Sequence, residues 1–190
     1  MRYRVGIYGG MGCGKSTVLQ HLAEAGANVL DADKINAQLP QDAAYLEAVA
    51  AVCPEAVREG RLDKAALRRW VLASDENRLA LNAIAHPRIA QIIEQRAESG
   101  LWFVEISVYV PDFVRMDESW HVVCAPDEQL KRVLARGGWT EEEAKRMMAA
   151  QTQGGLAPAD AVIVANDGTT ADLLHQVDER YAVLRREYGA

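Results

Sequence analysis

A glycine-rich stretch near the start of the chain, GGMGCGKS at residues 9–16, constrains the fold more than any other feature. Glycine destabilises helices and strands, so a run of glycines indicates a backbone that must approach a ligand closely or adopt an unusual conformation. An apolar run, Tyr3–Tyr8, precedes the stretch, and an amphipathic segment, Lys15–Ala25, follows it. The pattern G-x-x-x-x-G-K-[ST] between a strand and a helix is typical of a loop that binds nucleotide phosphates.

Apolar segments and helical segments alternate along the whole chain. The predicted strands are Tyr3–Tyr8, Ala27–Leu30, Leu101–Val108, Ser119–Ala125 and Ala161–Ala165. Strands that are separated by helices form a parallel sheet with helices on both faces. We therefore expect an α/β fold of the P-loop type, with a five-stranded parallel sheet in three α/β/α layers.

Glycine and proline divide the helical segments. Residues 34–100 are predicted to be helical almost throughout, with breaks near Pro40, at 53–60 and at His86-Pro87, where one helix would end and the next begin. Thr140 and Glu143 predict a capping box for a helix that follows the Gly137-Gly138 pair. No linker or repeat divides the chain, so we expect one domain: a core at about 1–33, 101–136 and 158–190, a helical part at about 34–100, and a small further part at about 137–157.

Composition excludes several classes of protein. The net charge of −6 argues against a nucleic-acid-binding protein, which would carry a basic face. No apolar run reaches the roughly 18 residues that a membrane-spanning helix needs. The three cysteines are widely separated and form no zinc pattern, which favours reduced thiols in the cytoplasm. We expect a cytoplasmic protein, a monomer or a weak homo-oligomer, that acts on a small molecule.

The residue types in the glycine-rich stretch predict specific roles. Backbone amides at the start of the following helix would surround a polyphosphate. The Lys15 ammonium would contact the β- and γ-phosphates of ATP, and the Ser16 hydroxyl would help to hold Mg²⁺. The predicted ATP-binding residues are Gly10, Met11, Gly12, Cys13, Gly14, Lys15, Ser16 and Thr17.

Two aspartates follow the second predicted strand. In an open parallel sheet the carboxyl ends of the strands face the ligand, so Asp31 and Asp33 are expected beside the phosphate loop. A carboxylate repels a γ-phosphate, but it can deprotonate an attacking hydroxyl or act as an outer ligand of Mg²⁺. We assign the role of base to Asp33 and a metal role to Asp31; the alternative is that one of them only caps the helix beginning at Lys34.

The class of nucleotide-binding protein can be narrowed further. The DxxG and NKxD motifs of a GTPase are absent from the chain. A motor or transporter ATPase would be longer and would carry an apolar strand that ends in an acid, for which NVLD at Asp31 and LWFVEI at Glu105 are the nearest candidates. A small-molecule kinase fits better.

Several further segments together resemble the dephospho-CoA kinase family, from Tyr3 to about Val177. They are VLDADKI, GRLDKAALRRWV, LNAIAHPRI, APDEQLKRVLAR, EEAKRMMAAQ and PADAVIVANDGT. The resemblance implies a nucleoside-monophosphate-kinase-like fold. It also implies that ATP phosphorylates the 3′-hydroxyl of the ribose of dephospho-CoA, which is the last step of coenzyme A biosynthesis.

The resemblance also implies roles for individual residues. Asp33 matches the base, while Arg68 and His86 match segments on the acceptor side, so the helical part at about 34–100 is expected to be the acceptor-binding insertion. Arg132 and Arg136 match the helix that leads into a small lid at about 137–157, and Asn166 matches a loop near the adenine; Arg132 and Asn166 are therefore further expected ATP-binding residues. A lid that closes over the transferring phosphoryl group needs a hinge, and Gly137-Gly138 directly follows Arg136. The alternatives are a solvated helix face for Arg68 and a helix end for His86; Gln151 remains undecided between a functional and a structural role.

Departures from the family pattern keep other functions open. The segment after the third strand, EISVYVP at residues 105–111, differs from the usual family sequence near the acceptor, and the lid carries few basic residues. One alternative is a related kinase for another acceptor, such as a deoxynucleoside monophosphate or a specialised metabolite. Another is a nucleotide-binding homologue that has lost catalysis.

Overall fold

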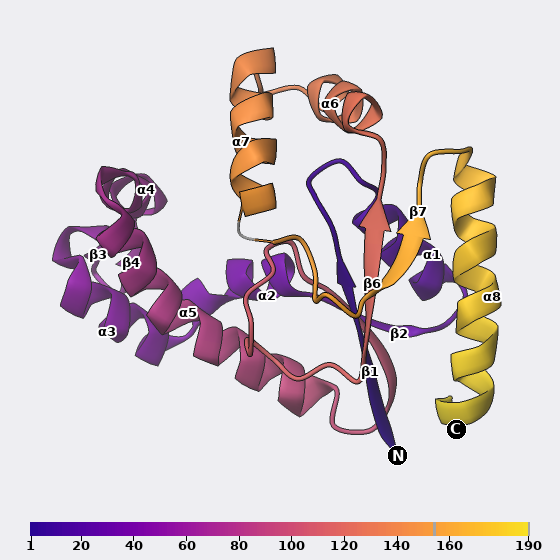
Figure 1. Cartoon of the computed structure of the whole chain (residues 1–190). Coiled ribbons are helices and arrows are strands. Elements are labelled where there is room, and N and C mark those ends of the chain that lie inside the picture. The colour runs from indigo at the N-terminus through magenta and orange to yellow at the C-terminus, as the bar shows by residue number, and fades with distance from the viewer. Residues whose placement is uncertain (154, 190) are drawn as a thin grey trace. The chain divides into compact units, whose positions relative to one another are not determined.

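Strand β1 (Arg2–Tyr8) lies at the centre of a parallel sheet (Figure 1). The computed structural model describes residues 1–153 and 155–189; Gly154, which belongs to the predicted lid, and Ala190 lie outside the described residues. The other strands are β2 (Asn28–Asp31), β5 (Gly100–Glu105), β6 (Glu118–Val123) and β7 (Val162–Ala165), in the order β2-β5-β1-β6-β7. All neighbouring pairs are parallel, so the predicted five-stranded parallel sheet is confirmed.

The described chain forms two compact units. The first consists of Met1–Ala32 and Ala97–Ala190 and contains the sheet, and the second consists of Asp33–Arg96. Within the described residues, every helix is too short or too polar to cross a bilayer.

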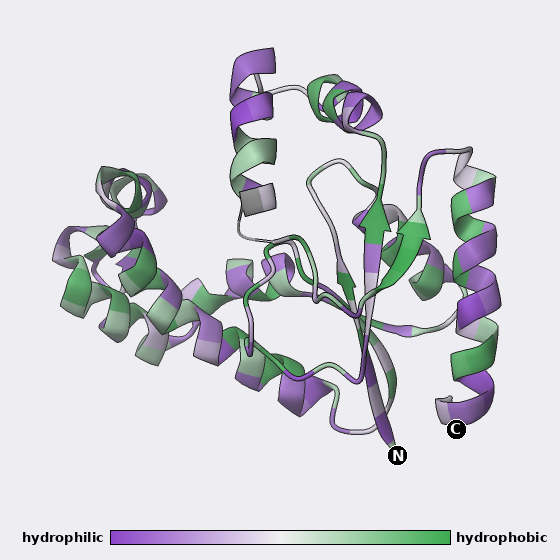
Figure 2. Ribbon diagram, in the orientation of Figure 1, coloured by the Kyte–Doolittle hydropathy of each residue, from purple (hydrophilic) through white to green (hydrophobic). Residues whose placement is uncertain are grey.

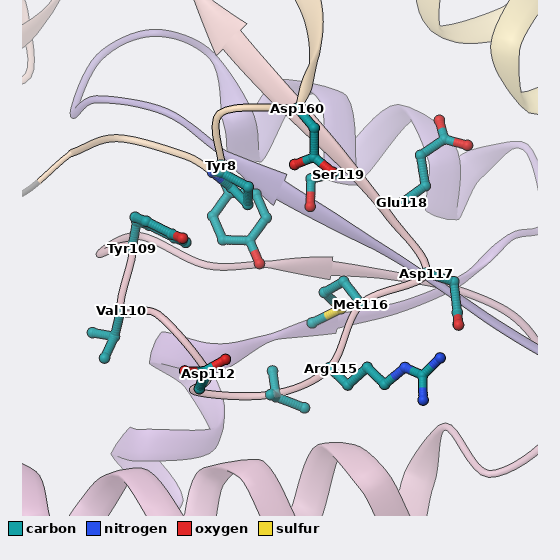
Figure 3. Close-up of a pocket in the computed structure, with 12 residues that line it drawn as sticks. Tyr8, Tyr109, Val110, Asp112, Arg115, Met116, Asp117, Glu118, Ser119 and Asp160 are labelled. Atoms are coloured by element: carbon teal, nitrogen blue, oxygen red, sulfur yellow. The ribbon is translucent and has the colours of Figure 1, made fainter.

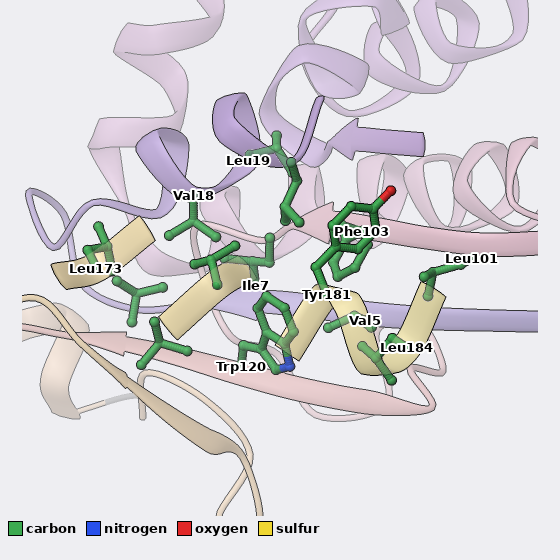
Figure 4. Close-up of a cluster of buried hydrophobic side chains, with 14 of the residues drawn as sticks. Val5, Ile7, Val18, Leu19, Leu101, Phe103, Trp120, Leu173, Tyr181 and Leu184 are labelled. Carbon is green, nitrogen blue, oxygen red and sulfur yellow. The ribbon is translucent and has the colours of Figure 1, made fainter. Parts of the chain in front are cut away.

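One face of the sheet forms the hydrophobic core of the first unit. Helices α1 (Lys15–Glu24) and α8 (Thr170–Tyr188) contact the strands, and their apolar side chains pack on Val5, Phe103 and Trp120 (Figure 4). The ring centroid of Phe103 lies 5.3 Å from that of Trp120 and 5.6 Å from that of Tyr181. Alternate residues of β1 point to opposite faces, which places Val5 and Ile7 in this core and leaves Tyr8 to the other face.

Helix termini in the first unit follow local sequence signals. Helix α6 (Pro126–Ala135) begins with proline and two acids, and α7 (Glu141–Gln153) begins with the predicted capping box. The Thr140 amide donates to Glu143 Oε2 at 2.9 Å, and the Glu143 amide donates to Thr140 Oγ1 at 3.3 Å. Hydrophilic residues cover most of α7, whereas hydrophobic residues fill β7 and much of β6 (Figure 2).

The second unit is helical with one short hairpin. It begins with α2 (Ala32–Gln38), a 3₁₀ turn (Leu39–Gln41) and α3 (Ala43–Val52). A second 3₁₀ turn (Pro54–Ala56) leads into a hairpin of β3 (Val57–Arg58) and β4 (Arg61–Leu62). Helices α4 (Lys64–Ala73) and α5 (Asp75–Arg96) complete the unit. The hairpin was not expected. Its two turn residues, Glu59 and Gly60, have φ of 52° and 71°, as a tight two-residue turn requires.

The predicted helix break at His86-Pro87 is wrong, because α5 continues through Pro87. Proline removes one backbone donor, which leaves the carbonyl of Ala83 without its helical partner. Both Ala83 and Pro87 are exposed, so water can satisfy that carbonyl. On the other face, the buried side chains of Ala85, Ile89 and Ile93 hold the helix together.

The third strand is shorter than predicted. It ends at Glu105 rather than at Val108, because its pairing with both neighbours stops there: Glu105 pairs with Ile7 of β1 and with Asp31 of β2, and Ile106 makes the last backbone bond, to the carbonyl of Ile7 at 2.9 Å. The chain then leaves the sheet and forms the irregular segment that precedes β6.

Phe103→Ala should lower the free energy of unfolding by about 3–5 kcal/mol, since it removes a fully buried ring and leaves a cavity between two aromatic side chains. Urea denaturation of the purified variant measures this loss. Ile163→Ala is a matched control on β7, where the side chain is 54% exposed, and should cost less than about 1 kcal/mol. Equal losses for the two variants would contradict the assignment of the core.

Candidate active site

The loop between β1 and α1 needs its glycines for two physical reasons. Gly9, Gly12 and Gly14 have φ of 143°, 80° and 105°, a region that other residues rarely adopt. In addition, there is no room for side chains: a Cβ at Gly9 would overlap the carbonyl oxygen of Val122, and one at Gly14 would lie 2.5 Å from Nδ2 of Asn166. Neighbouring elements therefore pack directly on the loop backbone.

The Lys15 side chain is turned back into this loop. It is only 7% exposed, and its Nζ donates to the carbonyl oxygens of Gly9 at 2.9 Å and Gly10 at 3.2 Å. A buried ammonium needs such partners to offset the loss of hydration. Because α1 begins at Lys15, the first backbone amides of the helix have no partner within the helix. The lysine and these amides together favour an anion at this position.

Oxygen ligands for a cation gather next to the loop. The Ser16 hydroxyl donates to Oε1 of Glu105 at 3.1 Å, and Glu105, at the carboxyl end of β5, is 5% exposed. The register of the sheet pairs Glu105 with Asp31 at the end of β2. In the described part of the chain, no three His, Cys, Asp or Glu side chains could hold a metal by themselves. This arrangement fits Mg²⁺, which keeps several waters and shares its coordination with substrate phosphates.

Three of the predicted ATP-binding residues, Cys13, Asn166 and Arg132, are connected by hydrogen bonds. Asn166, directly after β7, is buried, and its Nδ2 donates to the carbonyl of Cys13 at 2.7 Å. Its own carbonyl accepts from Nη2 of Arg132 at 3.2 Å. The Nη1 of Arg132 is buried and has no hydrogen-bond partner among the described residues. The described contacts of Asn166 brace the loop, so its predicted contact with adenine stays a prediction.

Two thiols lie side by side at the loop. The Sγ atoms of Cys13 and Cys124 are 3.3 Å apart, and Cys13 is 4% exposed. Burial, with a smaller contribution from the hydrogen bond to Cys13, raises the pKa of Cys124 to about 12, so this thiol stays protonated at neutral pH.

Side chains from α6 and from the lid helix α7 both bond to the loop at Met11. Gln129 of α6 donates from Nε2 to the Met11 carbonyl at 2.8 Å, and Gln151 of α7 accepts from the Met11 amide through Oε1 at 3.0 Å. Between the two helices, Gly137 and Gly138 have φ of 74° and 82°, which suits a hinge. Arg136, at the end of α6, is exposed, and its contact with a phosphoryl group stays a prediction.

The remaining predicted residues belong to the second unit. Asp33 is exposed in the first turn of α2, and Arg68 is exposed on α4. His86 is half-buried on α5, and burial lowers its pKa, so the ring is neutral at pH 7. Their roles toward the acceptor stay predictions.

Sequence reasoning missed two neighbours of the loop. Gln129 lies on an amphipathic helix and carries no motif. His121, on β6, pairs in register with Tyr8; burial first, and then the charge of Lys15, lower its pKa. Glu105 could be recognised in the sequence as an acid at the end of an apolar strand. Its hydrogen bond with Ser16 could not be predicted, because it depends on which strands are neighbours in the sheet.

A separate pocket of about 440 Å³ lies in the first unit and is lined mainly by the segment that connects β5 to β6 (Figure 3). The rings of Tyr8 and Tyr109 meet edge to face there with centroids 5.7 Å apart, and burial raises the pKa of Tyr8 to about 12. Four acids and one arginine contribute to its lining: Asp112, Asp117, Glu118, Asp160 and Arg115. This excess of negative charge disfavours a polyphosphate in the pocket; the binding of the nucleotide at the phosphate loop stays a prediction.

Gly14→Ala should weaken ATP binding at least tenfold, because the added Cβ pushes against Asn166 in a backbone conformation that alanine rarely adopts. Isothermal titration with ATP measures the effect. The matched control is Gly26→Ala: Gly26 also has a positive φ, 84°, but nothing lies within 4 Å of an added Cβ. This control should lose some stability and bind ATP normally; an equal loss of affinity in both variants would contradict the role of the close contact.

Comparisons with known proteins agree with this geometry. The family model described as dephospho-CoA kinase matches residues 3–172. A dephospho-CoA kinase of Bordetella avium is 39% identical over 183 residues, which is 90% of this chain and 85% of the relative; that of Geobacter sulfurreducens is 34% identical over 190 residues, 94% and 96% of the two chains.

Solved structures show the same fold. A Thermus thermophilus protein superimposes with a TM-score of 0.78 at 30% identity, covering 96% of this chain and 98% of the other. A dephospho-CoA kinase from Campylobacter jejuni, at 21% identity, gives a TM-score of 0.67 and coverage of 98% and 100%. With a family model that spans most of its length and relatives above 30% identity, the chain belongs to the dephospho-CoA kinase family.

Proposed function

We propose that this protein transfers the γ-phosphoryl group of ATP to the 3′-hydroxyl of the ribose of dephospho-CoA, which yields coenzyme A and ADP. The observation that carries the proposal is the phosphate loop, with Lys15 buried against its carbonyls and Ser16 bonded to Glu105, in a chain that matches the family over residues 3–172. The protein acts in the cytoplasm on a small molecule, without nucleic acid or a membrane, as a monomer or a weak homo-oligomer.

ATP binds through residues 10–17. The Lys15 ammonium exchanges its carbonyl partners for β- and γ-phosphate oxygens, and the orphan Nη1 of Arg132 provides a further donor for an anion. Ser16 and Asp31, with Glu105 beside the serine, would hold Mg²⁺, which when bound would neutralise part of the phosphate charge. Asn166 stabilises the loop through its hydrogen bond to the Cys13 carbonyl and contacts the adenine of ATP.

Phosphoryl transfer then needs a base and a clamp. Asp33 lies in the first turn of α2, two residues after β2 ends at Asp31. It accepts the proton of the 3′-hydroxyl as that oxygen bonds to the γ-phosphorus. The bond between the γ-phosphorus and the bridging oxygen breaks, and ADP leaves. Arg136 stabilises the developing charge when the lid closes, while Arg68 and His86 bind the acceptor.

Asp33→Asn should lower kcat by about 10²- to 10⁴-fold, since the amide cannot accept the proton, while the Kd for ATP changes less than about threefold. The assay measures ADP formation with dephospho-CoA and identifies the phosphorylated hydroxyl. Asp178→Asn is the matched control, because Asp178 lies on α8 and pairs with His21 at the surface; its turnover should be normal.

Three outcomes would contradict separate parts of the proposal. Near-normal turnover of Asp33→Asn would remove Asp33 as the base. Clear preference for a deoxynucleoside monophosphate or another acceptor in a substrate panel would replace dephospho-CoA. ATP binding without transfer to any acceptor would favour a homologue that has lost catalysis.

A further inference from the structure

The backbone amide and the backbone carbonyl of Met11 each bond to a glutamine side chain, one on the lid helix α7 and one on α6, the helix that leads into the lid. Its amide donates to Gln151 Oε1 at 3.0 Å, and its carbonyl accepts from Gln129 Nε2 at 2.8 Å. Gln129 lies on α6 and Gln151 lies near the end of α7, on opposite sides of the Gly137-Gly138 pair. Two helices that are separated by a hinge therefore meet on one residue of the phosphate loop.

Met11 needs this support because the loop offers little of its own. It lies between Gly10 and Gly12, which have high conformational freedom, and before the first turn of α1, so no helical bond can restrain it. The nearest backbone bond across the loop, from the Cys13 amide to the Gly10 carbonyl, is 3.3 Å long. The two glutamines add restraints that the backbone lacks.

The glycines of the loop make this contact possible. A Cβ at Gly10 would lie 2.5 Å from Nε2 of Gln129, and one at Gly12 would lie 2.9 Å from Cγ2 of Val133 and 3.1 Å from the Gln129 carbonyl. Helix α6 thus packs directly on the loop backbone, which fixes Gln129. The position of Gln151, in contrast, depends on α7.

Helix α7 has few other anchors. Ala144 is its one fully buried residue among those described, and most of its remaining side chains are exposed. An element with so little buried apolar surface is held weakly and can detach at low cost. The hydrogen bond that the Met11 amide donates to Gln151 therefore contributes much of the interaction that holds the carboxyl end of α7 against the loop.

We propose that Gln151 is a positioning residue that couples the lid helix α7 to the phosphate loop, an inference that rests on the proposed kinase function. When α7 is docked, Gln151 accepts the hydrogen bond of the Met11 amide and stabilises the loop conformation that binds ATP. Because coupling between two sites is reciprocal, ATP that orders the loop also favours the docked lid. Gln151 acts through Met11 and makes no contact with the reacting atoms.

The test uses the full-length protein and substitutions at Gln151 that differ in one property. Gln151→Met keeps the length of the side chain but has no oxygen to accept the Met11 amide, whereas Gln151→Glu keeps the acceptor. Hydrogen exchange of the Met11 amide, measured without nucleotide, reports the contact directly. Titration with ATP reports the consequence for binding and requires no acceptor substrate.

Gln151→Met should speed exchange of the Met11 amide at least threefold and raise the Kd for ATP by about 3- to 10-fold, the effect of losing one hydrogen bond. Gln151→Glu should restore the slow exchange. In turnover, Gln151→Met should raise KM for ATP and leave KM for dephospho-CoA unchanged. Gln20→Met is the matched control, because Gln20 is exposed on α1, where its Nε2 donates to Glu24, and it should change none of these values.

Each possible failure has a distinct meaning. Unchanged Met11 exchange in Gln151→Met would refute the contact, and faster exchange with unchanged ATP affinity would refute the coupling. Loss of slow exchange in Gln151→Glu would show that the oxygen acceptor is not what holds Met11. If the unmodified protein binds ATP but does not phosphorylate dephospho-CoA, the proposed function fails, and the exchange and binding measurements still decide the role of Gln151.

Discussion

The burial of the Lys15 ammonium inside a glycine loop is the interaction on which the site depends. A cation that is 7% exposed requires oxygen partners, and the loop supplies them by turning the carbonyls of Gly9 and Gly10 inward. That turn demands positive φ at Gly9 and leaves no space for a Cβ against Val122. Because α1 begins at Lys15, its first backbone amides have no partner within the helix, so one local conformation both gives the lysine hydrogen-bond partners and favours an anion at the helix N-terminus.

The rest of the first unit positions this loop through contacts from different strands. Asn166 follows β7 and holds the carbonyl of Cys13, while Glu105 ends β5 and accepts the Ser16 hydroxyl. These residues lie far apart in the sequence, and they meet because the carboxyl ends of parallel strands share one edge of the sheet. The strand order, rather than any local motif, therefore determines which polar side chains surround the phosphates.

Features with a local cause could be predicted from the sequence, and features with a tertiary cause could not. The strand–loop–helix arrangement around residues 9–16 and the capping box at Thr140 depend on residues that are close in the chain, and the structure contains both. The contacts predicted between the loop and a nucleotide stay predictions. The break at Pro87 was wrong because α5 is stabilised by packing on its buried face, which outweighs one lost backbone bond. Likewise, no pattern marks Gln129, because its role depends on how α6 packs on Gly10 and Gly12.

The segment at residues 105–111, which differs from the usual family sequence, has two parts with different contacts. Glu105 is the last residue of β5, and its carboxylate bonds to Ser16, so it belongs to the nucleotide side of the site. Tyr109 and Val110, in contrast, line the pocket with the four acids. The two parts of the segment therefore have different surroundings: Glu105 lies against the phosphate loop through Ser16, whereas Tyr109 and Val110 lie in a negatively charged pocket, where like charge disfavours a phosphate group.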